Sequence, residues 1–170
     1  LVHTCPMTTT ASAKTPKRTL HLMDVENLCG GTQPRPEQVR RVRSAYNRQL
    51  PTGRDDLVFI AMSHFAAAAI LLEWPDSAER RLQSGDDGAD LALIEMLYDT
   101  LAITEVDRVV IASGDGIFAE HAARLQQKEI EVMVATAYGQ LSRRLAFAAR
   151  NSVDLLADDL SATSTMRKAA

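Results

Sequence analysis

Three aspartates stand where an α/β protein usually carries its chemistry. Asp24 closes the apolar run 19–23, Asp115 follows the apolar run 106–112, and Asp90 opens a helical pattern that begins just after a glycine. Functional sites of parallel sheets lie at the carboxyl ends of the strands, where the strand order reverses. If the two runs are neighbouring strands, we expect these carboxylates to converge at one edge of the sheet.

A cluster of carboxylates is destabilised by electrostatic repulsion, so its presence needs an explanation. Two carboxylates about 4–5 Å apart repel by several kcal/mol at an effective dielectric near 20, so such clusters raise a pKa or bind a cation. Oxygen ligands favour Mg²⁺ or Mn²⁺ over zinc. Two simpler interpretations stay open: Asp90 can stabilise a helix amino terminus, and Asp115 can cap the helix that follows it. Asp24 gains nothing obvious in stability from its place.

The elements around these residues alternate between strand and helix. Short apolar runs predict strands at 19–23, 56–62, 78–82, 106–112 and 130–135, with a last edge strand at 153–156. Apolar residues at helical spacing predict helices at 36–50, 65–73, 89–102, 117–128 and 141–150. Such βαβ units, with right-handed crossovers, predict a doubly wound, Rossmann-like three-layer sandwich with a mainly parallel sheet.

Length and composition suit one domain. With 170 residues, 46% of them hydrophobic, the chain can build a real core, which we place at 19–157. Residues 1–18 are expected to be a disordered leader, with Met7 as a candidate natural start, and 158–170 a flexible tail. The net charge of −3 gives no global pull toward nucleic acid or membrane. No apolar run approaches a membrane span, and two cysteines are too few for a disulfide framework, so we expect a cytoplasmic protein.

Positive charge beside the acidic centre is a further expectation. Arg143 and Arg144 begin the last predicted helix, and Ser142 with the helix amino terminus adds phosphate donors. A second basic group, for which a solvated helix face is the competing interpretation, comprises Arg35, Arg40, Arg41 and Arg43. Phe65 and Trp74 are interpreted as packing residues rather than base-stacking platforms.

Three motifs in this order resemble the NYN domains, relatives of the PIN nucleases. They are Asp24-Val25-Glu26-Asn27 at the end of a strand, Gly88-Ala89-Asp90 at the start of a helix, and Ser113-Gly114-Asp115 after an apolar strand. The resemblance covers about 20–156. It implies a PIN-like fold with strand order 3-2-1-4-5 and metal-dependent cleavage of RNA.

The resemblance also implies roles. Asp24, Asp90 and Asp115 would hold Mg²⁺ or Mn²⁺, which polarises a phosphate and lowers the pKa of a bound water. Asn27 would orient that water or a phosphate oxygen, or else cap the loop after its strand. Ser113 would donate to phosphate or merely tie its turn.

Two departures from the family pattern keep another function open. The family often carries further acids where this chain has Met96 and Ile117, so one metal ion with three acids is expected rather than a two-metal site. The same departures favour a catalytically silent RNA-binding or protein-interaction module. A phosphoaspartate phosphatase is disfavoured, because Glu26 stands where its second aspartate belongs. Assembly into a homodimer is left open.

Overall fold

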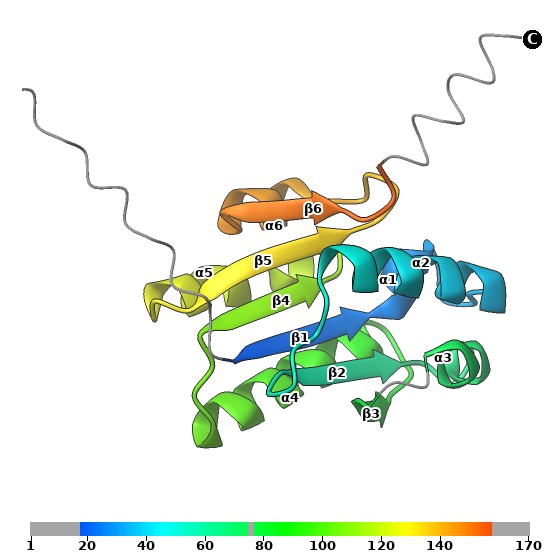
Figure 1. Cartoon of the computed structure of the whole chain (residues 1–170), viewed down its shortest axis with the longest axis horizontal. Coiled ribbons are helices and arrows are strands. Elements are labelled where there is room, and N and C mark those ends of the chain that lie inside the picture. Colours follow the sequence, from blue (N-terminus) through cyan, green and yellow to red (C-terminus); the bar gives the residue numbers. More distant parts are fainter. Residues whose placement is uncertain (1–17, 75–76, 158–170) are drawn as a thin grey trace, which may run out of the picture.

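A computed structural model describes residues 18–74 and 77–157, and its strands form one sheet in which every neighbouring pair is parallel (Figure 1). The order across the sheet is β3-β2-β1-β4-β5-β6. The strands are β1 (Thr19–Asp24), β2 (Leu57–Met62), β3 (Glu79–Leu82), β4 (Arg108–Ala112), β5 (Glu131–Thr136) and β6 (Asn151–Asp154). The predicted leader and tail lie outside the described residues, except for Arg18.

Helices cover both faces of this sheet, which gives three layers (Figure 1). One face carries α1 (Val25–Cys29), α2 (Pro36–Gln49) and α3 (Ala67–Glu73). The other carries α4 (Gly88–Ile103), the 3₁₀ turn η1 (Gly116–Phe118), α5 (Ala119–Gln127) and α6 (Arg143–Ala148). Across the two described ranges, no helix has the length and apolar character that a membrane crossing requires.

Alternation along the strands supplies a separate core to each face. Leu20 and Leu22 of β1 pack toward α4 and α5, while Met23 packs toward α2. In β4, Val109 and Ile111 lie on the first of these faces. Since successive side chains of a strand point to opposite faces, apolar runs without alternation predict a sheet buried on both sides. These strands have that pattern.

The predicted order 3-2-1-4-5 is confirmed, and β6 extends it beyond β5. Element ends differ from the predictions by at most two residues. The last strand begins at Asn151 and ends at Asp154, so the prediction 153–156 was two residues late; Leu155 and Leu156 are buried after the strand has ended. The short helix α1 was missed. It begins immediately after β1 because the Asp24 carboxylate accepts a hydrogen bond from the Asn27 backbone and caps it.

The pairing of β1 with β4 sets the place of the motifs. The register pairs Met23 with Ala112, so the next residues, Asp24 and Ser113, leave the sheet side by side. Both central strands therefore deliver a motif to the same edge, as the converging carboxylates require.

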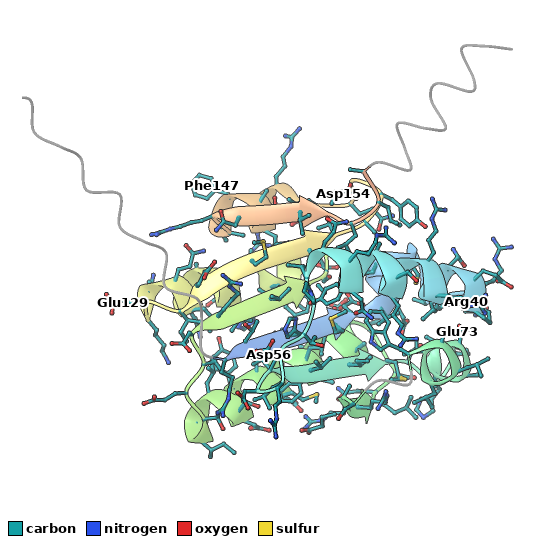
Figure 2. The ribbon with its side chains drawn as sticks, viewed as in Figure 1. Arg40, Asp56, Glu73, Glu129, Phe147 and Asp154 are labelled. Carbon is teal, nitrogen blue, oxygen red and sulfur yellow. The ribbon has the colours of Figure 1, made fainter. Side chains whose placement is uncertain are left out.

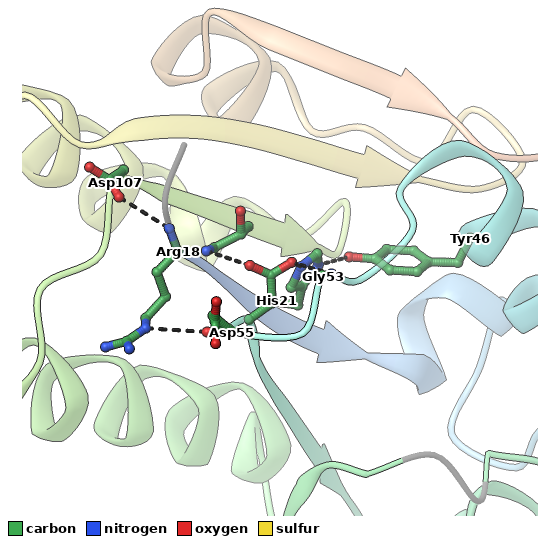
Figure 3. A network of polar contacts seen from close by, with 8 residues as sticks. Arg18, His21, Tyr46, Gly53, Asp55 and Asp107 are labelled. Atoms are coloured by element: carbon green, nitrogen blue, oxygen red, sulfur yellow. Dashed lines mark hydrogen bonds and ion pairs between the residues drawn. The ribbon is translucent and has the colours of Figure 1, made fainter. Parts of the chain in front are cut away.

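A buried histidine, His21, lies in the middle of β1, before the carboxyl edge that carries the motifs (Figure 3). Tyr46 of α2 lies 2.6 Å from Nδ1 of His21, and the Asp56 carboxylate lies 3.5 Å from Nε2. Because a carboxylate only accepts, the proton belongs on Nε2, and Nδ1 accepts from the Tyr46 hydroxyl. Asp56 is itself held by the backbone N–H groups of Thr19 and Gly53, at 2.8 and 2.6 Å. Burial lowers the pKa of His21, and Asp56 opposes this only in part.

This network predicts a pH dependence of stability. In the unfolded chain His21 binds a proton near pH 6.5, whereas the folded protein binds it only at lower pH, so the free energy of unfolding should fall as pH drops from 7.5 to about 5. His21→Gln should lose about 1–3 kcal/mol at pH 7.5, because the buried Tyr46 hydroxyl loses its acceptor, and its pH slope should be shallower. Urea unfolding across this range measures both, with exposed His64→Gln as the control. Equal slopes in wild type and His21→Gln would contradict the assignment.

Candidate functional site

A cavity of about 590 Å³ opens where the carboxyl ends of β1, β2 and β4 meet the start of α4. The structure brings Asp24, Asp90 and Asp115 together in its wall, although they are far apart in the sequence. Other polar wall residues are Glu26, Asn27, Thr32, Ser63, Gln83, Ser84, Asp87 and Gln140. The cavity is therefore strongly acidic in a protein whose net charge is only −3.

Asp24 is the most deeply buried of the three carboxylates. Its side chain is 5% exposed, and it accepts one hydrogen bond from the Ser113 hydroxyl at 2.8 Å and one from the Asn27 backbone at 3.1 Å. Burial raises the pKa of Asp24, and both hydrogen bonds oppose that rise because they favour the charged form. Asp24 thus has the two donors that a buried carboxylate needs.

Asp90 has no such support. Its Oδ1 is buried and has no hydrogen-bond partner within the described residues. Burial raises the pKa of Asp90 to about 8, and the negative charges of Asp24, Asp115 and Asp87 add to this rise. A hydrogen bond between Asp24 and Asp90 places the proton on Asp90. At neutral pH Asp90 therefore keeps its proton, which a cation could replace.

Asp115 both caps a turn and faces the cavity. Its Oδ1 accepts from the Ile117 backbone at 2.9 Å, so it is the N-cap of η1, while its side chain lines the cavity wall. Its own N–H donates to the Ser113 hydroxyl at 3.1 Å. The capping role considered from the sequence is present, and it fixes the direction of the carboxylate.

Ser113 and Asn27 hold the two central loops together. Ser113 is fully buried, does not line the cavity, and donates its hydroxyl hydrogen bond to Asp24. The Asn27 Oδ1 accepts from the Gly114 backbone at 2.8 Å, which directs its NH₂ group elsewhere. A side chain on Gly114 would meet the Gln140 carbonyl oxygen at 1.7 Å, so only glycine fits there. In this structure both side chains hold the turns together.

Two further acids were missed as site residues. Glu26 is buried in the wall and accepts from the backbone and hydroxyl of Ser63, at 2.6 and 3.2 Å. Asp87 lies in the left-handed region, with φ of 53°, one residue before α4. Glu26 belongs to the Asp24-x-x-Asn27 motif, and this is the only signal that the sequence offered for it. That Glu26 lies on a helix turn facing the cavity is visible only in the structure.

The predicted phosphate contacts lie outside this cavity. Arg143 and Arg144 line a separate shallow hollow with Ala119, Glu120 and Phe147. Ser142 caps α6, since its hydroxyl accepts from the Leu145 backbone at 3.2 Å, and its N–H donates to the Gly114 carbonyl at 2.9 Å. The helix is six residues long, against the ten predicted. Its amino end therefore adjoins the loop of Asp115 without reaching the cavity.

Two arginines of the second basic group have structural roles. Arg40 makes a bidentate ion pair with Glu73 of α3, at 2.9 and 2.6 Å (Figure 2), and Arg43 donates to the Glu73 carbonyl. These contacts join α2 to α3. None of the four arginines lines the cavity, which agrees with the solvated-face interpretation.

Three apolar positions complete the comparison with the sequence. Met96 is 2% exposed in the core beneath α4, and Ile117 packs against the same core, so neither lines the cavity. Trp74 is buried as expected. Phe65 is not: it is 72% exposed and stands in the cavity wall, so its interpretation as a packing residue was wrong. It follows the end of β2, where the chain turns outward.

The donor set fits a hard divalent cation. Three carboxylates with one unpartnered oxygen and one displaceable proton are the groups that Mg²⁺ or Mn²⁺ prefers. Within 18–74 and 77–157, no group of three or more His, Cys, Asp or Glu side chains is already gathered closely enough to hold a metal ion. The fit therefore rests on donor chemistry and on the charge that the cavity concentrates.

The parallel sheet of order 3-2-1-4-5-6 and the acidic cavity at its carboxyl edge together define the class of protein, a PIN-like α/β domain. The chain belongs to the NYN domain family, whose model matches residues 22–156. NYN domains are part of the PIN-like superfamily and are generally nuclease-like. The resemblance read from the three motifs is thereby confirmed.

The other comparisons bear on the fold. A protein of unknown function from Vibrio parahaemolyticus has a solved structure with a TM-score of 0.58 to this chain, at 18% sequence identity. The match covers 85% of this chain and 96% of that one. At this identity the likeness shows a shared fold alone. No curated protein sequence matches the chain.

The state of Asp90 predicts how its removal changes stability. Its folded pKa of about 8 lies above the unfolded value near 4, so the native state of the wild type keeps a proton and loses stability as pH rises between these values. Asp90→Asn lacks this loss and can still donate to Asp24. Its Tm should exceed that of wild type by about 2–4 °C or more at pH 8, a gain of at least about 1 kcal/mol for a chain of this size, with little difference at pH 4.

Adding Mn²⁺ extends the same measurement. It should raise the Tm of wild type and raise that of Asp90→Asn much less, because one ligand is lost. Asp99→Asn, an exposed change on the same helix, is the matched control and should behave as wild type. Equal Mn²⁺ shifts in wild type and Asp90→Asn would argue against a cation at Asp90.

Proposed function

We propose that this protein is an Mg²⁺- or Mn²⁺-dependent endoribonuclease that hydrolyses phosphodiester bonds of RNA at the acidic cavity. One observation carries the proposal: Asp90, packed against the buried Asp24 and beside Asp115, has an unpartnered carboxylate oxygen and a raised pKa. Repulsion among these carboxylates is relieved either by the proton on Asp90 or by a bound cation. Membership of a nuclease-like family supports the reaction class.

Asp24, Asp90 and Asp115 would hold the metal ion. When bound, it would polarise the phosphate and lower the pKa of a water so that hydroxide is available near neutral pH. The rest of the chain's contribution is positional. The Ser113 hydroxyl and the Asn27 backbone hold Asp24 in place and favour its charged form, and the η1 turn holds Asp115 toward the cavity. Asn27 has its oxygen tied to Gly114, so its NH₂ group would serve as a donor to a phosphate oxygen or to the water.

Arg143 and Arg144 would bind the RNA backbone beside the cavity. Both are exposed, and neither has an ion-pair partner within the described part of the chain. They follow directly after Ser142, which is bonded to the loop of Asp115. Phosphate contacts of this kind orient the strand without reading its sequence. Their position supports a substrate that continues from the cavity onto α6.

A catalytically silent RNA-binding module is the second candidate. It is favoured by Met96 and Ile117, whose side chains lie in the core where family members often carry additional acids. Such a module would keep the arginines and the fold and would lack hydrolysis. The two candidates therefore differ only in turnover.

Cleavage is tested best with Asp115→Asn. The amide oxygen can still cap Ile117, so the fold should survive, while a metal ligand is weakened. With Mn²⁺ or Mg²⁺ and a mixed set of RNA substrates, wild type should cleave and Asp115→Asn should be slower by roughly 100-fold. Asp99→Asn serves again as the control. Wild type that binds RNA but cleaves none with either metal would establish the silent module instead.

The arginines predict a salt-dependent affinity. Arg143→Ala with Arg144→Ala removes two phosphate contacts, so RNA binding should weaken and the slope of log K against log salt should flatten by about 1.4 for a single strand. The control Arg48→Ala with Arg54→Ala changes the net charge equally on exposed residues elsewhere. Titrations at several salt concentrations measure the slope. If both double variants lose affinity alike, binding reflects net charge and not this site.

A further inference from the structure

The hollow on α6 contains the most exposed large apolar side chain of the described residues. Phe147 is 95% exposed, and it projects from the outer side of the sandwich, away from the core (Figure 2). It shares the hollow with Arg143 and Arg144, four and three residues earlier. Residues at these spacings are neighbours on a helix surface. One small surface therefore combines an aromatic face with two cations.

The rest of α6 explains why Phe147 points outward. Leu145 is fully buried and anchors the helix to the core beneath β5, and the helix has no second buried position. The acid in the hollow, Glu120, is engaged by Arg124 one helical turn along α5. Among the described residues, Arg143 and Arg144 are therefore left without an ion-pair partner. The helix is thus held in place by Leu145 on its inner side, while its outer side presents arginine side chains that can bind a ligand.

An aromatic ring beside two free guanidinium groups suits a ligand with a flat π-face and a nearby negative charge. Grooves that bind single-stranded nucleic acid combine these two features, with bases stacked on aromatic rings and basic groups along the backbone. Ile103, at 86%, is almost as exposed but does not line this hollow, so exposure alone does not make such a surface. The combination distinguishes α6.

We propose that Phe147 stacks a nucleobase of single-stranded RNA while Arg143 and Arg144 bind the adjoining phosphates. The inference rests on the proposed ribonuclease function and names its substrate class. A base can lie on an aromatic ring only when it is not paired and stacked within a helix. A duplex would meet the arginines through its backbone and leave Phe147 unused.

The path from the carboxylates to this surface is short. Gly116 follows Asp115 directly, and a side chain there would come within 3.1 Å of the Ser142 hydroxyl and 4.0 Å of the Arg144 Cβ. The bare backbone at Gly116 therefore adjoins both the cavity wall and the first turn of α6. Phe147 lies about 4.5–6 Å further along the helix than the two arginines. An RNA strand that leaves the cavity over Gly116 meets the arginines first and Phe147 next.

Crossing a protein variant with an altered RNA isolates the stacking. Asp115→Asn protein, chosen so that RNA is not consumed, is titrated with a single-stranded oligouridylate of about 12 nucleotides and with an abasic strand of equal length. Adding Phe147→Leu keeps an apolar side chain without a π-face. It should weaken oligouridylate binding at least about fivefold and leave abasic binding unchanged. Phe147→Trp should restore or strengthen binding of oligouridylate, and Ile103→Ala should change neither.

Three results would overturn the inference. They are unchanged oligouridylate affinity in Phe147→Leu, an equal loss for both strands, and no binding of either strand. A wild type that sediments as a dimer and becomes a monomer in Phe147→Leu would assign this surface to a second copy of the chain instead. Cleavage by wild type is measured separately. If RNA is cleaved while Phe147→Leu matches wild type in binding, only the inference fails; if stacking is found without cleavage, only the hydrolytic function fails.

Discussion

The burial of a carboxylate at the end of a central strand is the constraint to which the rest of this edge responds. Asp24 leaves β1 almost without solvent, so its charge must be compensated by the protein. The Ser113 hydroxyl and the Asn27 backbone supply that compensation, and they do so only because β1 and β4 pair with Asp24 and Ser113 side by side. The parallel register, the cap of α1 and the Ser113 turn thus all contribute to stabilising the buried Asp24 carboxylate.

The hydrogen bonds that a buried carboxyl group needs are present for Asp24 and incomplete for Asp90. The second carboxyl group is hydrogen-bonded to the first, but it has an oxygen that no described group satisfies. Proteins usually avoid such a group, because an unsatisfied buried acceptor costs about 1–3 kcal/mol. Its retention beside two other acids concentrates negative potential at one point, while positive charge stands on the neighbouring helix α6. Opposite fields at adjoining surfaces suit a substrate whose phosphates must approach an acidic centre without being repelled along their whole length.

Much of this arrangement follows from the sequence, and the failures have physical causes. The parallel sheet and the meeting of Asp24 with Asp115 follow from the apolar runs and the rule that sites occupy the carboxyl edge, whereas the strand order was implied by the resemblance to the NYN domains. The direction of a side chain at a loop does not follow from periodicity. Phe65 therefore looked like core and is exposed, and the positions of Met96 and Ile117 could be placed only by seeing which helix face packs against the sheet. Capping decided where two helices begin: α1, which was missed, begins after its cap Asp24, and α6 begins after its cap Ser142, two residues later than predicted.

Gly114 has a consequence that reaches beyond packing. Its N–H is bonded to Asn27, its carbonyl to the N–H of Ser142, and its Cα lies against the Gln140 backbone with no space for a methyl group. The segments that follow β1, β4 and β5 thus all meet at Gly114. A displacement at the start of α6 is transmitted through one rigid joint to the turn that carries Asp115. We therefore expect a substitution that shifts one of these two surfaces to shift the other as well.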